Sequence, residues 1–168
     1  MSYYVLVPEA PGRFGSETVF IDERARPPVL EKLNIEFDGW LGDALVEEIC
    51  CYLVTEVLRD RILTLNPSGV TFGEAKATRS KEFEERDPMR ALPPFAWLQV
   101  TGIAAQDDFG YTKSNGCSLV VSSRILEILT DVGISHCAVV PFKKWRGARA
   151  AILEKIRKFE LDQPLPKG

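Results

Sequence analysis

The sequence predicts one α+β domain, with a mixed sheet, two strand–helix–strand units and a C-terminal helix. The main observation is a repeat: a short apolar run ends in a hydroxyl residue, and an amphipathic stretch follows, once after Thr55 and again after Ser122. The length of 168 residues suits one domain with a buried core. Strand-like and helix-like patterns also alternate along the chain. We expect residues 1–162 to form the domain and 163–168 to be a flexible tail.

The first third of the chain predicts three strands. Tyr3 to Val7 is aromatic and β-branched, which favours a strand. The glycine-rich and proline-containing segment 11–16 predicts a turn or loop. A second short strand is expected at 18–21, and the prolines within 26–28 end it. Apolar and polar residues then alternate over 33–37, as in a strand with one wet face.

The first copy of the repeat predicts a strand, a capped helix and an extended segment. The apolar run 50–54 is short, and Thr55 offers a hydroxyl to cap a helix start. Apolar residues recur at helical spacing from Val57 to Leu65, and the turn residues 66–69 end that helix. Extended structure is expected over 70–72 and 75–78.

The second copy follows a long connection. Residues 79–94 are charged and marked by prolines, 95–100 predict a strand, and 107–116 predict a polar loop. Residues 119–121 then predict a strand with Ser122 as the helix cap.

The apolar face of the second helix is expected at Ile125, Leu126, Ile128 and Leu129, and Gly133 is suited to end it. An apolar strand is expected at 137–140, closed by Pro141. The C-terminal helix is expected over 148–159, with Ala151, Ile152, Ile156 and Phe159 on one face.

Composition narrows the function classes. The net charge is −3 and the pI near 5.3, which disfavours nucleic-acid binding, since that usually needs a basic surface. No run of about eighteen apolar residues is present, so no membrane span is expected. The N-terminus lacks the basic leader and apolar run of a secretion signal, so a cytoplasmic protein is expected.

The cysteines and the single histidine do not predict a catalytic or metal site. Cys50, Cys51, Cys117 and Cys137 form no CxxC pair, and we expect free thiols that pack as small apolar groups. His136 and Cys137 are neighbours on a strand, so their side chains point to opposite faces. No zinc, phosphate-loop or nucleophile-elbow pattern is present. We therefore expect no catalytic residue, no metal and no cofactor.

Candidate partner-binding residues are acidic or aromatic. The charged connection carries a cluster of carboxylates that could steer a basic protein partner, namely Glu82, Glu84, Glu85 and Asp87. Asp107 and Asp108 add charge in the polar loop and are expected to be solvated. Trp40 and Trp145 lie in or beside loops, where an aromatic side chain often anchors a partner.

The strand-to-helix junctions resemble those of bacterial polymorphic-toxin immunity proteins. The similar segments are Leu53–Glu56, Leu119–Ser122, Phe37–Leu41 and Leu92–Phe95, within roughly residues 33–142. The resemblance implies a non-catalytic cytoplasmic protein that binds and neutralises a cognate toxin. It assigns no interface residues, because these vary between family members. The alternative is a small cytoplasmic enzyme or ligand-binding domain with a carboxylate-lined pocket. An exposed edge strand would permit a homodimer.

Overall fold

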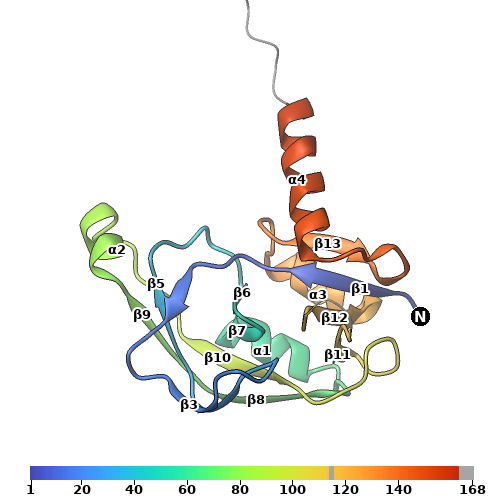
Figure 1. Cartoon of the computed structure of the whole chain (residues 1–168), viewed down its shortest axis with the longest axis horizontal. Coiled ribbons are helices and arrows are strands. Elements are labelled where there is room, and N and C mark those ends of the chain that lie inside the picture. The colour runs from blue at the N-terminus through green and yellow to red at the C-terminus, as the bar shows by residue number, and fades with distance from the viewer. Residues whose placement is uncertain (114–115, 163–168) are drawn as a thin grey trace, which may run out of the picture.

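The structure, a computed structural model, has the expected α+β architecture (Figure 1). It describes residues 1–113 and 116–162, so the expected tail and part of the polar loop lie outside the described residues. The elements in chain order are β1 (Tyr3–Val7), β2 (Gly12–Phe14), β3 (Val19–Asp22), β4 (Val29–Lys32), β5 (Asn34–Phe37), β6 (Leu45–Glu48), β7 (Cys51–Thr55), α1 (Glu56–Leu63), β8 (Val70–Glu74), β9 (Lys76–Arg79), α2 (Lys81–Arg86), β10 (Phe95–Val100), β11 (Phe109–Tyr111), β12 (Leu119–Ser122), α3 (Ser123–Val132), β13 (Ala138–Pro141), a 3₁₀ turn η1 (Phe142–Lys144) and α4 (Ala148–Asp162).

The repeat in the sequence is a duplication in the fold. In the described part of the chain, two four-stranded sheets have equivalent orders, β6-β7-β10-β8 and β11-β12-β1-β13. Thr55 at the end of β7 pairs with the first residue of β10, and Ser122 at the end of β12 pairs with the first residue of β1. Equivalent positions from β7 to β8 and from β12 to β13 are 67 residues apart, the separation of Cys50 and Cys117.

The two halves are interlocked through one strand each. Strand β1 belongs to the first half of the chain but lies between β12 and β13 of the second half. Strand β10 opens the second half but lies between β7 and β8 of the first. Each sheet therefore contains one strand from the other half, and neither sheet is complete without both halves of the chain.

The paired helices of the two halves pack against each other in one core. Leu58 and Ile62 of α1 and the equivalent Ile125 and Leu129 of α3 are fully buried in the same cluster. Burial of these side chains removes apolar surface from water, which is the main favourable contribution to folding. An exposed ion pair of 2.6 Å between Arg61 and Asp131 joins the outer faces of the same helices.

A smaller layer extends from the first half. It comprises the sheet β2-β5-β9, the hairpin β3-β4 and helix α2, which lies at one end of the molecule (Figure 1). Its own core includes Ile35, Phe37 and Phe83, packed against Phe95 of β10. Strands β5 and β9 pair in parallel, whereas every other pairing between described strands is antiparallel.

Several elements differ from the sequence prediction. Segment 11–16 was expected to be a turn, but Gly12–Phe14 is strand β2. The missing side chain of Gly12 permits the close approach of the Glu36 carbonyl on β5, which any Cβ would block. Strands β4, β6 and β11 also lie where no strand was predicted, because they are only three or four residues long and receive their stability from pairing.

The two helix caps behave differently. Thr55 is confirmed as the cap of α1, since its Oγ1 accepts a hydrogen bond of 3.2 Å from the Leu58 amide. Ser122 occupies the equivalent position before α3, but its hydroxyl makes no cap bond. It donates instead to the Asp108 carboxylate at 2.7 Å, so the predicted capping role of Ser122 is wrong.

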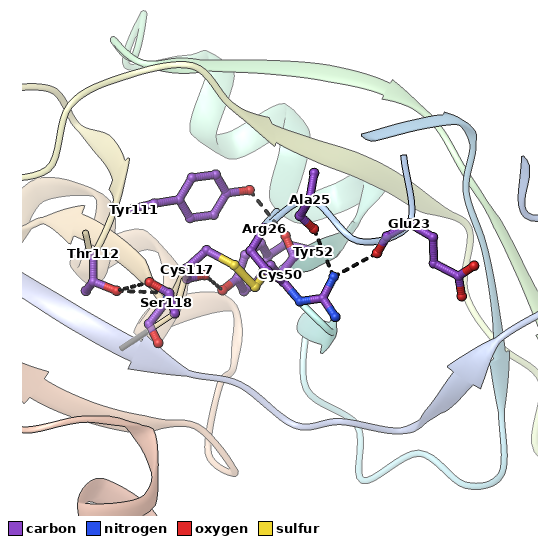
Figure 2. The surroundings of a disulfide bond; sticks show 10 residues. Glu23, Ala25, Arg26, Cys50, Tyr52, Tyr111, Thr112, Cys117 and Ser118 are labelled. Atoms are coloured by element: carbon purple, nitrogen blue, oxygen red, sulfur yellow. Dashed lines mark hydrogen bonds between the residues drawn. A yellow bond between two sulfur atoms is a disulfide. The ribbon is translucent and has the colours of Figure 1, made fainter. Parts of the chain in front are cut away.

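Cys50 and Cys117 form a disulfide, which corrects the expectation of four free thiols (Figure 2). Their Cα atoms are 5.6 Å apart, and the bond joins equivalent positions in the two halves. Each bridged cysteine also accepts a hydrogen bond from a tyrosine hydroxyl. Tyr52 donates to the Cys117 carbonyl at 2.9 Å, and Tyr111 donates to the Cys50 carbonyl at 3.3 Å. No sequence pattern pairs these cysteines; the duplication of the fold brings them together.

The other two cysteines, Cys51 and Cys137, are free and buried, as expected of small packing groups. Burial raises the pKa of each thiol to about 12. Neither side chain therefore offers a thiolate at neutral pH.

Among the described helices, none combines the length and the apolar character needed to cross a membrane.

Candidate partner-binding surface

Helix α2 presents the predicted acidic cluster to solvent. Ser80 caps the helix by accepting a 3.1 Å hydrogen bond from the Phe83 amide, and the Phe83 ring anchors the helix in the core. One buried residue in a six-residue helix leaves the remaining positions facing outward. The acids exposed on or directly after this helix are Glu82, Glu84, Glu85 and Asp87.

These carboxylates are only loosely paired within the chain. Glu84 lies 3.8 Å from Arg79, and Glu85 lies 3.8 Å from Lys81. Exposed ion pairs at such distances contribute little to stability, typically less than about 1 kcal/mol. Glu82 and Asp87 take part in no ion pair among the described residues. The cluster is therefore available to an outside partner at a small energetic cost.

A hollow of about 440 Å³ adjoins α2 and is formed by chain segments far apart in sequence. One wall comes from the segment that follows β1, a second from the loop after β5, and a third from α2 and the residues after it. Its lining includes acidic, basic and aromatic side chains, namely Glu9, Asp38, Trp40, Phe83, Arg86, Asp87 and Arg90.

Trp40 is the aromatic residue that the fold brings to this surface. Its indole N–H donates to the Asp43 carbonyl at 3.0 Å, and its ring meets the Phe95 ring edge-on, with centroids 6.0 Å apart. The Arg90 guanidinium lies 5.0 Å from the indole centroid, within the range of a cation–π contact. Trp40 is thus held rigidly in the wall of the same hollow that Asp87 lines.

Glu9 was not singled out from the sequence, although it lies in this wall. The residue is only 9% exposed. Its Oε1 accepts a hydrogen bond of 2.7 Å from the Leu41 amide, whereas its Oε2 has no partner. Burial raises the pKa of this carboxyl above its ordinary value, the Leu41 hydrogen bond opposes the rise, and the charge of Asp43 adds to it. A lone glutamate after a strand carries no sequence signal for this environment.

Asp108 is buried, so the prediction that it lies on a solvated acidic surface is wrong. Its carboxylate accepts hydrogen bonds from Ser122, from the Ser68 amide and from the Arg124 guanidinium. The Arg124 hydrogen bond, followed by those from Ser122 and Ser68, holds the pKa of Asp108 well below its usual range against the opposing effect of burial. A fully bonded carboxylate that is 6% exposed is a structural group.

Asp107 and Trp145 lie elsewhere than on the α2 surface. The Asp107 carboxylate is half-buried and accepts a 2.8 Å hydrogen bond from the Ile103 amide, which shapes its own loop. Trp145 lines a different hollow of about 370 Å³ together with Tyr111 and Phe142. The structure therefore places Trp40 and Asp87 in one hollow beside α2, which carries Glu82, Glu84 and Glu85, and it separates them from Asp107, Asp108 and Trp145.

His136 is held by a buried aspartate. Its Nδ1 lies 2.9 Å from an Asp43 oxygen, and its backbone amide donates to the same carboxylate at 2.9 Å. Asp43 is only 1% exposed. His136 and Cys137 were expected to be neighbours on a strand, but both precede β13, His136 in a turn; the Cys137 thiol contacts the Ala138 carbonyl.

Comparison of the chain with protein-family models, with curated proteins and with solved structures gave no match. Within residues 1–113 and 116–162, no three histidine, cysteine or acidic side chains are grouped as metal ligands.

Proposed function

We propose that this protein is a non-catalytic immunity protein that binds a cognate bacterial toxin and neutralises it. The observation that carries the proposal is the exposed acidic cluster of α2 beside a rigid tryptophan and a hollow. Protein-binding surfaces combine an aromatic anchor with charges that guide the approach of an oppositely charged partner. The resemblance of the strand-to-helix junctions to immunity proteins supports the same reading.

The partner would be a basic surface of the toxin. Acidic clusters accelerate association with such a surface and add specificity, and they do so without contributing strongly to the stability of the free protein. Blocking the active site or the substrate path of a toxin needs no catalytic group on the inhibitor. Neither nucleic acid nor a membrane is part of the proposed mechanism.

Co-expression with the protein encoded next to this chain's gene tests the proposal. If that neighbour is the toxin, its expression alone arrests growth, and co-expression restores growth and yields a complex on co-purification. Persistent toxicity with no recovered complex contradicts the proposal for that pair. Light scattering on the purified complex also gives the stoichiometry and shows whether the free protein is a homodimer.

A matched pair of variants connects the effect to the surface. Glu82→Gln, Glu84→Gln and Glu85→Gln together remove three negative charges from α2 while keeping the helix. Glu23→Gln, Glu31→Gln and Glu127→Gln remove the same charge from exposed positions outside α2. We expect the first set to slow association about tenfold at low salt, and the second to change it much less.

Cytoplasmic location is part of the proposal, because immunity protects the cell that makes or receives the toxin. The Cys50–Cys117 disulfide speaks against it, since disulfides persist mainly in oxidising compartments. Alkylation of thiols in intact cells decides this point: a cytoplasmic protein yields four modifiable cysteines after unfolding, and an oxidised one yields two.

The alternative function is a small enzyme or ligand-binding domain with a carboxylate-lined pocket. The raised pKa of Glu9 in the wall of the hollow favours this alternative, because perturbed carboxyl groups gather at binding and catalytic sites. Saturable binding of a small metabolite at the hollow, with no toxin bound, would decide for the alternative.

A further inference from the structure

Two features of the hollow beside α2 are unexplained by the packing of the chain itself. The Oε2 atom of Glu9 is buried and has no hydrogen-bond partner, although the other oxygen is bonded to the Leu41 amide. The Nε atom of Arg90, in the same lining, also lacks a partner. A buried polar atom without a partner costs free energy, so such atoms are uncommon in folded proteins.

Glu9 has the character of an anionic anchor. The residue is 9% exposed, and its backbone is fixed because its carbonyl accepts the Glu47 amide at 2.9 Å. Its side chain is fixed by the Leu41 bond. The Glu9 carboxylate is thus held in place, poorly hydrated and bonded through only one oxygen. A hydrogen-bond donor on a binding partner would therefore interact with it favourably, and a charged donor most of all.

The aromatic lining of the hollow already accommodates guanidinium groups of this chain. Arg90 lies over the Trp40 ring at 5.0 Å, and Arg79 lies 5.6 Å from the Phe83 ring. Aromatic rings bind cations through their negative faces. Of the exposed acids on or directly after α2, Asp87 lines the hollow, and Glu82, Glu84 and Glu85 lie on the adjoining helix.

The wall of the hollow also contains basic residues, Arg86 and Arg90, which favour an acidic guest. Arg86 donates to the Asp38 carbonyl at 2.9 Å, so part of its donor capacity is already used. Asp38 is in turn paired with Arg13 at 2.9 Å. Arg86 and Arg90 form no ion pair among the described residues, so an acidic guest could bind to them. Only a donor, however, satisfies the buried oxygen of Glu9.

We infer that this hollow receives an arginine or lysine side chain of the protein partner, whose cationic group donates to the free oxygen of Glu9 between Trp40 and α2. This inference rests on the proposed function for the identity of the partner, but the pocket chemistry can be tested without any toxin. The acids of α2 would guide the basic surface, and Glu9 would hold one side chain after docking.

Titration with small probes tests the pocket. N-acetyl-arginine amide carries the cation, N-acetyl-aspartate amide carries an anion, and N-acetyl-alanine amide carries neither. Binding is followed by NMR at the Leu41 amide and the Trp40 indole N–H. We expect saturable shifts with the arginine probe only. No saturable shift up to the solubility limit, or saturation by the aspartate probe alone, overturns the inference.

The variant that isolates the anchor is Glu9→Gln. Glutamine keeps an oxygen for the Leu41 amide and puts an NH₂ group in place of the free oxygen, so it removes the charge and the free acceptor at nearly unchanged side-chain size. The fold is expected to persist, and the NMR spectrum verifies this. We expect Glu9→Gln to weaken binding of the arginine probe about tenfold, and Glu82→Gln on α2 to weaken it less than twofold. Equal weakening by both variants would mean that only the overall charge of the surface affects probe binding, and it would overturn the inference.

The toxin experiment separates the two proposals. If the wild-type protein binds the neighbouring toxin, and Glu9→Gln dissociates from it about tenfold faster, both proposals are supported. If the wild type binds and Glu9→Gln binds equally well, the anchor inference fails and the immunity function stands. If the wild type does not bind the toxin but does bind the arginine probe through Glu9, the immunity function fails for that pair and the pocket chemistry stands.

Discussion

Replacement of Asp108 by alanine is the most direct test of how the two halves are held together. The Asp108 carboxylate bonds to Ser68 after α1, to Ser122 at the end of β12 and to Arg124 in α3. Alanine leaves the buried Ser122 hydroxyl without its acceptor, which costs about 1 kcal/mol or more, and it also removes the acceptor of the Ser68 amide, whose residue is exposed. Arg124 remains 40% exposed, so water recovers part of its interaction.

The total is a loss of about 3 kcal/mol in the free energy of unfolding, because hydrogen bonds to a charged group contribute more than those between neutral groups. For a protein of this size, this corresponds to a fall in Tm of roughly 6–12 °C. Urea unfolding followed by tryptophan fluorescence measures the change. The matched control is Asp107→Ala, which removes one hydrogen bond to the Ile103 amide and should cost about 1 kcal/mol.

The pH dependence provides a second readout of the same interaction. The folded pKa of Asp108 is lowered, so its contribution is present above the unfolded pKa of about 3.9 and is lost as the pH falls through the folded value. The stability difference between wild type and Asp108→Ala should therefore be constant near neutrality and narrow below about pH 4. A difference below about 1 kcal/mol at pH 7 would refute the role assigned to Asp108.

Three further outcomes are expected. Cys50→Ala with Cys117→Ala should lower the free energy of unfolding by about 2–4 kcal/mol, measured by urea titration against wild type without reductant, because the bridge closes a loop across a separation of 67 residues; equal stability would show that the bridge constrains nothing. Glu9→Gln should stabilise the free protein by about 1 kcal/mol at pH 7, and since the folded pKa of Glu9 is raised, this gain should vanish as the pH is lowered through about 4; a gain independent of pH would exclude the charge as its cause. Cys51 and Cys137 should react with a thiol reagent only after unfolding, because burial raises the pKa of both to about 12; rapid labelling of the native protein would contradict their burial.

The repeat around Thr55 and Ser122 allowed much of the main fold to be predicted from the sequence. Periodicity located β7, α1, β12 and α3, because each element has enough apolar residues in register to define a strand or a helix face. The sequence could not indicate that β1 and β10 exchange between the halves, since strand exchange depends on long-range pairing. The Cys50–Cys117 bridge follows from that arrangement and was missed for the same reason.

The candidate site was only partly predictable. Charge density identified the acids of α2, and Trp40 stood out as an aromatic residue in a loop. Charge alone could not distinguish the exposed Asp87 from the buried Asp108, because burial is set by distant segments such as α3. Glu9 illustrates the same limit: its environment depends on the loop carrying Leu41, which is remote in sequence and adjacent in space.

The candidate site lies outside the elements that are duplicated in the two halves. An aspartate before each hairpin holds a turn of the other half: Asp43 holds the His136 turn, and Asp108 holds the Ser68 turn. These shared features stabilise the frame in both halves. All residues that line the hollow belong instead to segment 8–44, between β1 and β6, and to segment 75–94, which connects β8 to β10. The exposed residues of this layer can therefore vary in sequence without disturbing the paired sheets, whereas its buried side chains pack against β6, β7 and β10. Variable exposed positions on a fixed scaffold are what a partner-specific surface requires.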